Sequence, residues 1–307
     1  TGCTMNHILR ITFFSLLFGL ALMMTLFIRT PDFHIVPAET FEEFYITPPS
    51  KTSDPILPDH SINPGSTNGI ITKGGRLIGG TSDHHWIETP KIIPYLHSKQ
   101  VYRTFSKTDF LGQFQAAIKQ RPRANPQLTF EKAPSPEDLN NFAFAISGGW
   151  DPFPRKPQYI KENHERYYPM VEKALAQLHL QAPVSIGEII QVDLSGDGTD
   201  ELLIIAEYPT KDSDWVNQKT LLEQAYSLIL LYPAHNQLET AMILIGSLQE
   251  PTRYDILAVA DFNGDWSMEC LIRETVYTPT SQKAHRDILF TLENKKPQKV
   301  LEHRWQR

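Results

Sequence analysis

Hydrophobic residues follow three different patterns along this chain. Near the N-terminus they form one uncharged run, Ile11–Ile28 (ITFFSLLFGLALMMTLFI), between Arg10 and Arg29. In the middle of the chain they recur at helical spacing. From Ile186 onward they form short runs of Ile, Leu, Val and Tyr that are separated by turn residues. Long uncharged runs are typical of membrane helices, and short runs between turn residues are typical of antiparallel strands.

The N-terminal run predicts a transmembrane helix within residues 1–30. Its 18 residues are at the lower limit for a helix that crosses a bilayer. Arg10 precedes the run and Asp32 follows it, so the positive-inside rule predicts a membrane-anchored protein with its N-terminus inside and the bulk of the chain extracytoplasmic. A cleaved signal peptide is the alternative, although the small residues of Val36–Ala38 lie well beyond the apolar core.

Proline-rich and glycine-containing stretches divide the rest of the chain into three predicted regions. Residues 31–69 are rich in Pro, Ser and Thr, which predicts a linker. Residues 70–134 contain short apolar runs beside the glycine pairs Gly74–Gly75 and Gly79–Gly80, which predicts a small β-containing module. Residues 135–307 are predicted to form the main domain.

Two helices are expected at the start of this main domain. Ser135–Pro136–Glu137 suits the first turn of a helix that extends to about Ile146. Between Glu162 and Leu180, apolar residues recur at helical spacing, so this segment is expected to cover a hydrophobic core.

Eight strands are expected in the remainder of the chain. The predicted strands are Ile186–Asp193, Leu202–Tyr208, Tyr226–Tyr232, Glu239–Leu248, Tyr254–Asp261, Cys270–Tyr277, Asp287–Leu292 and Val300–Arg304. An acidic turn recurs in the sequence, so the strands divide into two similar units of four. The predicted fold class is α+β, mostly antiparallel β: two four-stranded repeat units with covering helices, preceded by the transmembrane helix.

The acidic turn of each unit lies between two apolar strands. We name these turns loop 1 (Asp193–Glu201) and loop 2 (Asp261–Glu269), and we number the nine positions of each from its first aspartate. Oxygen-bearing groups stand at positions 1, 3, 5, 7 and 9. They are Asp193, Ser195, Asp197, the Thr199 carbonyl and Glu201 in loop 1, and Asp261, Asn263, Asp265, the Ser267 carbonyl and Glu269 in loop 2.

This spacing predicts calcium sites. Ca²⁺ binds six to eight oxygen atoms, and three carboxylates in one short loop repel one another unless a cation lies between them. A helix–loop–helix calcium site requires a bidentate Glu at position 12, where this chain has Ile204 and Ile272 in apolar strands. We therefore expect strand–loop–strand sites for Ca²⁺. The alternative is an acidic β-turn without metal, because Asp, Gly and Ser are common turn residues.

The pattern D-x-[S/N]-x-D-G-x-x-E between apolar strands resembles the calcium loop of FG-GAP, integrin-like (VCBS-type) repeats of bacterial exported proteins. The resemblance covers about Ile186–Arg304. It implies that the ligand sets named above bind calcium and stabilise a β-propeller blade or a similar small sheet. The chain also resembles bacterial membrane-attached proteins in which a capping region precedes two such repeats.

Two features depart from that family. Trp266 takes position 6 of loop 2, where loop 1 has Gly198. This position normally has φ > 0, which costs a residue other than glycine about 1–2 kcal/mol. Loop 2 is therefore expected to bind calcium weakly or to be held by packing alone. Two repeats also cannot close a propeller, which requires about four blades.

Charge and motifs limit the function classes. The net charge of −6 excludes nucleic acid as a main partner. The sequence contains no nucleophile elbow, zinc-protease motif or phosphate loop, and the pair His84–His85 lacks metal-ligand spacing. We therefore expect a non-catalytic calcium-binding module with a structural or interaction role. Its expected partners are the membrane, through the N-terminal helix, and a protein or cell-envelope polymer. The alternative is an extracytoplasmic hydrolase whose site is not visible in the sequence.

Overall fold

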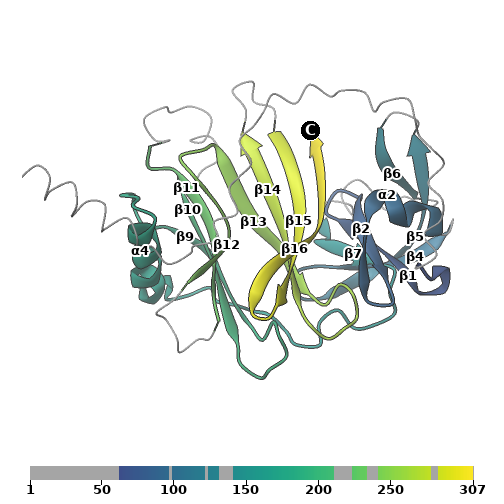
Figure 1. The fold of residues 1–307 in the computed structure, drawn as a ribbon, viewed down its shortest axis with the longest axis horizontal. Helices are drawn as coiled ribbons and strands as arrows, with labels where there is room; N and C mark the ends of the chain where they lie inside the picture. Colours follow the sequence, from purple (N-terminus) through teal and green to yellow (C-terminus); the bar gives the residue numbers. More distant parts are fainter. Residues whose placement is uncertain are drawn as a thin grey trace, which may run out of the picture. The chain divides into compact units, whose positions relative to one another are not determined.

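The computed structural model of the protein describes residues 62–96, 99–121, 124–130, 141–210, 223–233, 241–277 and 283–306. All of them belong to the second of the chain's two compact units, Ala38–Arg307. Three antiparallel sheets, which we name A, B and C, contain most of these residues (Figure 1).

Sheet A has seven strands in the order β1-β7-β4-β5-β6-β2-β3. Their bounds are β1 Thr67–Thr72, β2 Arg76–Ser82, β3 His85–Glu88, β4 Gln100–Phe105, β5 Phe110–Arg121, β6 Ala124–Phe130 and β7 Phe144–Ile146. Because β1 also pairs with β2, the strands other than β3 form a closed ring. The short helical segments η1 (Pro64–Ser66), α2 (Thr89–Ile92) and η2 (Ile93–Tyr95) flank these strands in the sequence.

Sheets B and C are successive antiparallel meanders. Sheet B has the order β12-β11-β10-β9-β8, with β8 Gln158–Tyr159, β9 Ile186–Val192, β10 Glu201–Tyr208, β11 Tyr226–Tyr232 and β12 Met242–Leu248. Sheet C has the order β13-β14-β15-β16, with β13 Thr252–Ala260, β14 Glu269–Tyr277, β15 Lys283–Glu293 and β16 Lys296–Gln306. Loop 1 joins β9 to β10 and loop 2 joins β13 to β14. Each loop's final glutamate begins the second strand of its hairpin, so Glu201 pairs with Val192 and Glu269 with Ala260.

Hydrophobic contacts place sheet C between the other two sheets. One face of sheet C, including Leu271 and Leu289, packs against residues of sheet A. Its opposite face, including Ile272, packs against sheet B. The far face of sheet B is covered by η3 (His164–Tyr167) and α4 (Tyr168–Gln177) (Figure 1). Burial on both faces explains why β10 and β11 are nearly continuous apolar runs.

The predicted fold class is wrong. The α-helices of the described residues, α2 and α4, have only four and ten residues, in place of two longer covering helices and a transmembrane helix. The helix predicted over residues 162–180 is shortened to α4, preceded by Asn163 in the left-handed region. The seven-stranded sheet A is larger than the small β-containing module that was expected over residues 70–134, and sheet B gains β8. The strands β9 to β16 do lie close to the eight predicted positions.

The helix predicted from Ser135 to Ile146 is wrong at its C-terminal end. Phe144–Ile146 form the strand β7, which lies between β1 and β4 and is completely buried. Residues 131–140, which contain the predicted start of this helix, lie outside the described residues. The burial of β7 between two strands overrides the helical start signal before it.

The predicted membrane-anchored, extracytoplasmic location is also corrected. In the described ranges, no helix is long and apolar enough to cross a bilayer. Residues 11–28, on which the prediction depended, lie outside those ranges, as does most of the predicted linker. The division of the chain into four regions stays a prediction.

Candidate cation-binding loops

Loops 1 and 2 have the same hydrogen-bond pattern. In each, the carboxylate at position 1 accepts hydrogen bonds from the backbone N–H groups of positions 4 and 6. The carboxylate at position 5 accepts one from position 7, and the carboxylate at position 9 accepts one from position 2. The four distances are 2.7, 3.0, 2.9 and 2.7 Å in loop 1 and 2.6, 3.0, 2.8 and 2.9 Å in loop 2.

The backbone of the two loops also matches in its left-handed positions. Gly196 and Gly264 at position 4 have φ of 76° and 80°. Gly198 at position 6 has φ of 84°, and Trp266 at the same position has φ of 72°. The alignment of loop 2 with loop 1 therefore predicted correctly that position 6 has a positive φ, because Trp266 adopts the left-handed conformation that Gly198 has in loop 1. Its side chain is 72% exposed.

Loop 1 is open to solvent and in contact with two basic side chains. Ser195, Asp197 and Thr199 are exposed, while Asp193 and Glu201 are buried. Lys295 Nζ lies 3.1 Å from Asp197 Oδ2.

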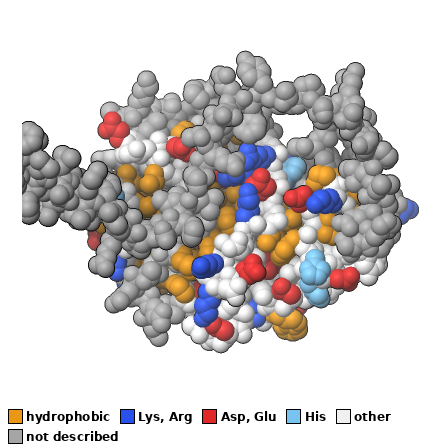
Figure 2. Space-filling model, in the orientation of Figure 1, with side chains coloured by type: hydrophobic (Ala, Val, Ile, Leu, Met, Phe, Trp, Pro, Cys, Tyr) orange, Lys and Arg blue, Asp and Glu red, His pale blue; other side chains and the backbone are white. Residues whose placement is uncertain are grey.

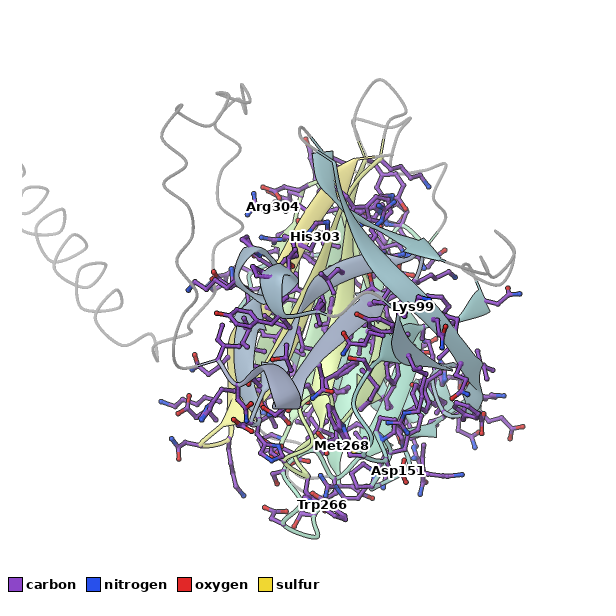
Figure 3. All side chains as sticks on the ribbon, turned by 90° about the vertical axis from the view of Figure 1, so that its right-hand side faces the viewer. Lys99, Asp151, Trp266, Met268, His303 and Arg304 are labelled. Atoms are coloured by element: carbon purple, nitrogen blue, oxygen red, sulfur yellow. The ribbon has the colours of Figure 1, made fainter. Side chains whose placement is uncertain are left out.

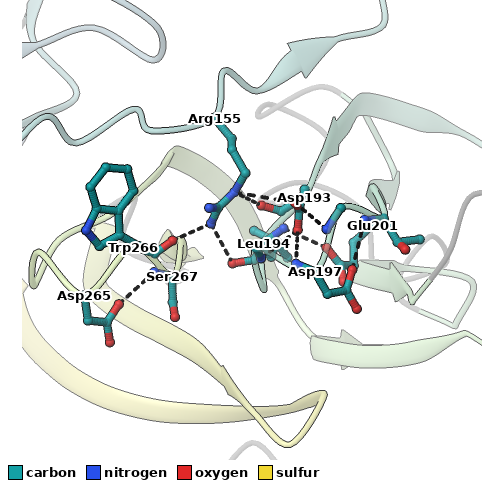
Figure 4. A network of polar contacts seen from close by, with 11 residues as sticks. Arg155, Asp193, Leu194, Asp197, Glu201, Asp265, Trp266 and Ser267 are labelled. Atoms are coloured by element: carbon teal, nitrogen blue, oxygen red, sulfur yellow. Dashed lines mark hydrogen bonds and ion pairs between the residues drawn. The ribbon is translucent and has the colours of Figure 1, made fainter.

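The second basic side chain, Arg155, lies between the two loops (Figure 4). Its Nε donates to the Asp193 carbonyl at 2.6 Å, and its Nη2 donates to the Trp266 carbonyl of loop 2 at 2.5 Å. A backbone hydrogen bond also joins the loops, from Met268 N to the Leu194 carbonyl at 2.8 Å.

Loop 2 packs against neighbouring segments at Asp261–Asn263 and at Met268–Glu269, while Asp265 and Trp266 are exposed. Asn263 Nδ2 donates to the His84 carbonyl at 3.2 Å and to Asp265 Oδ2 at 2.8 Å, and Asn263 Oδ1 accepts from Asp265 N at 3.1 Å. The His84 ring nitrogen Nδ1 lies 2.9 Å from the Asn263 carbonyl. Trp150 Nε1 donates to the Asp261 carbonyl at 2.8 Å. The side chain predicted as the position 3 ligand of loop 2 therefore already has protein partners.

Burial raises the pKa of both position 9 glutamates. Burial raises the pKa of Glu201, and the nearby charges of Asp193 and Asp197 raise it further. Burial raises the pKa of Glu269 well above its usual value, with Asp265 and Asp261 adding to the shift. Neither glutamate has a basic side chain within ion-pair distance among the described residues. Both loops therefore collect negative charge around a buried carboxyl group.

The described residues meet the chemical requirements for calcium only in part. Across the described ranges, no three His, Cys, Asp or Glu side chains lie close enough together to hold a metal ion. In loop 1 the oxygen types suit calcium. The carboxylate of Asp197 forms an exposed ion pair with Lys295. In loop 2 the amide of Asn263 is bonded on both sides. Loop 1 therefore fits calcium better than loop 2.

Sequence reasoning missed the residues that hold the loops. Arg155 and Trp150 belong to the segment SGGWDPFPR (147–155), which contacts both loops although it is far from them in sequence. His84 was rejected as a metal ligand, and here it contacts loop 2. No periodicity or motif links these residues to the loops, because the contacts depend on how sheets A, B and C pack.

A cavity of about 630 Å³ lies away from the loops, between α2 and β16. Among its lining residues, Lys299 Nζ lies 2.8 Å from Glu302 Oε2, and Glu88 Oε2 lies 3.8 Å from Lys91 Nζ. Figure 3 places His303 of this cavity at a distance from Trp266 of loop 2. Acidic and basic side chains are interspersed on the face drawn in Figure 2. The hydrolase alternative stays a prediction.

Comparison of the chain with protein-family models, with curated proteins and with solved structures found no significant match. The resemblance to FG-GAP repeats therefore stays a hypothesis that depends on the loop residues alone.

Proposed function

We propose that this protein is a non-catalytic β scaffold that binds calcium in loop 1 and has a structural or protein-interaction role. One observation carries the proposal: burial raises the pKa of Glu201 in loop 1, and the charges of Asp193 and Asp197 raise it further. A divalent cation between these groups offsets both the burial and the repulsion.

The residues that would hold calcium are those of the odd positions of loop 1. Asp193 accepts three backbone hydrogen bonds, from Gly196, Asp197 and Gly198, and a carboxylate has about four lone-pair sites. Asp193 therefore keeps capacity for a cation. Asp197 would exchange Lys295 for the cation, which is a small cost because exposed ion pairs contribute little to stability. Ser195 and Thr199, which supply the remaining two oxygens, are both exposed residues.

Loop 2 is proposed to have a packing role. Its Asn263 is engaged by His84 and Asp265, and its Glu269 is fully buried. Trp266 is exposed, and its backbone carbonyl accepts a hydrogen bond from Arg155, which also donates to the Asp193 carbonyl of loop 1. Tryptophan is enriched among the residues that dominate protein interfaces, which supports the interaction role.

The proposal is tested by thermal and chemical denaturation of the full chain with calcium, with magnesium and with a chelator. Calcium at 100 times its dissociation constant is expected to add about 2.7 kcal/mol of stability. Asp197→Asn removes one of the three carboxylate charges and is expected to reduce this gain strongly, and the matched variant Asp265→Asn is expected to retain it. Equal stability with calcium and with chelator would overturn the proposal. Loss of the gain in Asp265→Asn alone would move the site to loop 2.

A further inference from the structure

Arg155 places a permanent positive charge inside the region where loop 1 would bind calcium. Its Nε lies 3.8 Å from Asp193 Oδ2, and the two side chains are only 23% and 11% exposed. The guanidinium group carries a positive charge. Arg155, which lies outside loop 1, therefore places a positive charge beside the carboxylate at position 1.

The contacts of Arg155 are mainly with backbone carbonyl groups. It donates to the carbonyls of Asp193 and Leu194 in loop 1, at 2.6 and 3.4 Å, and to the Trp266 carbonyl in loop 2 (Figure 4). These three carbonyls are not among the proposed calcium ligands. Arg155 would therefore keep its hydrogen bonds when a cation enters the loop. Lys295 differs, because its partner is the side chain of Asp197, which is itself a proposed ligand.

We propose that Arg155 is a positioning residue that sets the calcium affinity of loop 1: it holds the loop in shape through three carbonyl groups, and its charge repels the incoming cation. This inference rests on the proposed function. Two like charges a few ångströms apart in a partly buried site interact strongly, and the repulsion is doubled for a divalent ion. The arginine therefore lowers affinity while it supports the binding conformation.

The test is calorimetric titration of calcium into the full-length protein, at low and at high ionic strength. The variants are Arg155→Gln, which removes the charge, and Arg155→Lys, which keeps the charge but loses the forked geometry. Arg155→Met removes the same charge with a side chain of similar length, and replaces Arg155→Gln should that variant not fold. Lys161→Gln, an exposed position outside both loops, is the control for a change in net charge.

We expect Arg155→Gln to bind calcium about tenfold more tightly than wild type at low ionic strength, with a smaller gain at high ionic strength. Arg155→Lys and Lys161→Gln should stay close to the wild-type affinity. In the presence of chelator, both Arg155 variants should melt at a lower temperature than wild type because the carbonyl contacts are lost.

The outcomes separate this inference from the proposed function. A purely structural role for Arg155 would lower the melting temperature without any gain in affinity. Unchanged or weaker calcium binding in Arg155→Gln, or in Arg155→Met where that variant replaces it, would therefore overturn the inference and leave the calcium site intact. Absence of calcium binding in wild type and in every variant would overturn the proposed function, and this inference with it.

Discussion

Loops 1 and 2 share a backbone and differ in their surroundings. Each carries the same four side-chain-to-backbone hydrogen bonds and the same two left-handed positions. In loop 1, the exposed position 5 carboxylate faces Lys295. In loop 2, the position 3 side chain is bonded to neighbouring groups, and the position 9 glutamate is completely buried.

This difference shows that a repeated sequence pattern can keep its conformation while its surroundings change. The hydrogen bonds within a loop depend on its own residues, so they survive in both copies. The capacity to bind a cation depends on whether oxygen atoms remain available, and the neighbouring segments decide this. Three predictions follow from the comparison, and each tests whether the surroundings of a loop outweigh its sequence.

The largest difference is expected when the position 1 aspartate is replaced. Asp261 is buried, and Asp261→Ala leaves the N–H groups of Gly264 and Trp266 without their acceptor. Hydrogen bonds to a charged group contribute about 1.5–3 kcal/mol each, so we expect a loss of about 3 kcal/mol in urea unfolding with chelator present. Asp193→Ala should cost about 1–2 kcal/mol, because water can reach the exposed N–H groups of loop 1.

Asp265→Ala is the matched control for removal of a carboxylate from loop 2. Its side chain is exposed, so the variant should unfold closer to wild type than Asp261→Ala does. Equal losses for Asp193→Ala and Asp261→Ala would show that the two loops have the same energetics despite their different burial.

The sequence located the strands of sheets B and C because their apolar runs and turn residues are local signals. The run Ile186–Val192 and the acidic turn that follows it need no knowledge of the rest of the fold. Residues 70–134 were expected to contain β structure, but the strand order of sheet A was missed because it brings together strands that are distant in sequence, such as β1 and β7. The strand Phe144–Ile146 was taken as helix because a favourable helix start precedes it.

The candidate site was predictable only as far as its own nine positions. The positive φ at Trp266 was anticipated from its alignment with Gly198, which is a comparison within the sequence. The roles of Arg155, Trp150 and His84 were not anticipated, because these residues reach the loops only after the sheets have packed. Such contacts between distant segments leave no spacing pattern in a single sequence.

The second prediction concerns the buried charge of loop 2. Burial raises the pKa of Glu269 well above its usual value, so the folded state binds this proton more tightly than the unfolded state does. Its contribution to stability is therefore present below about pH 4.3, the unfolded pKa, and is lost as the pH rises through the folded pKa. Glu269→Gln should raise stability at neutral pH by about 1–3 kcal/mol and leave it little changed at acid pH.

Urea unfolding across the pH range, with chelator present, measures this effect. Glutamine retains an oxygen to accept the hydrogen bond from Phe262 N. Glu201→Gln is the matched variant, and with excess calcium it should lose the calcium-dependent gain that Glu269→Gln retains. If Glu269→Gln instead removes calcium-dependent stability, loop 2 binds the cation and the contrast between the loops is wrong.

The smallest effects are expected at position 6, where the loops differ in backbone demand. A residue other than glycine with φ > 0 costs about 1–2 kcal/mol. Glycine avoids this cost but loses more conformational entropy on folding, so only part of the cost is recovered. Trp266→Gly should therefore stabilise the protein by about 0.5–1 kcal/mol. Gly198→Ala should destabilise it by about 1 kcal/mol through the backbone alone, since an added Cβ meets nothing within 4 Å.

Trp266→Ala separates the backbone from the indole. Alanine keeps the Cβ atom and the positive φ, so a cost that lies in the backbone predicts no gain for Trp266→Ala in the same unfolding experiment. An equal gain in both variants would place the cost in the exposed indole, which is 72% accessible to solvent. A gain for glycine alone means that the chain keeps a tryptophan where glycine is more stable. Selection for stability does not explain a tryptophan at this position. A contact between the exposed indole and a partner protein explains it.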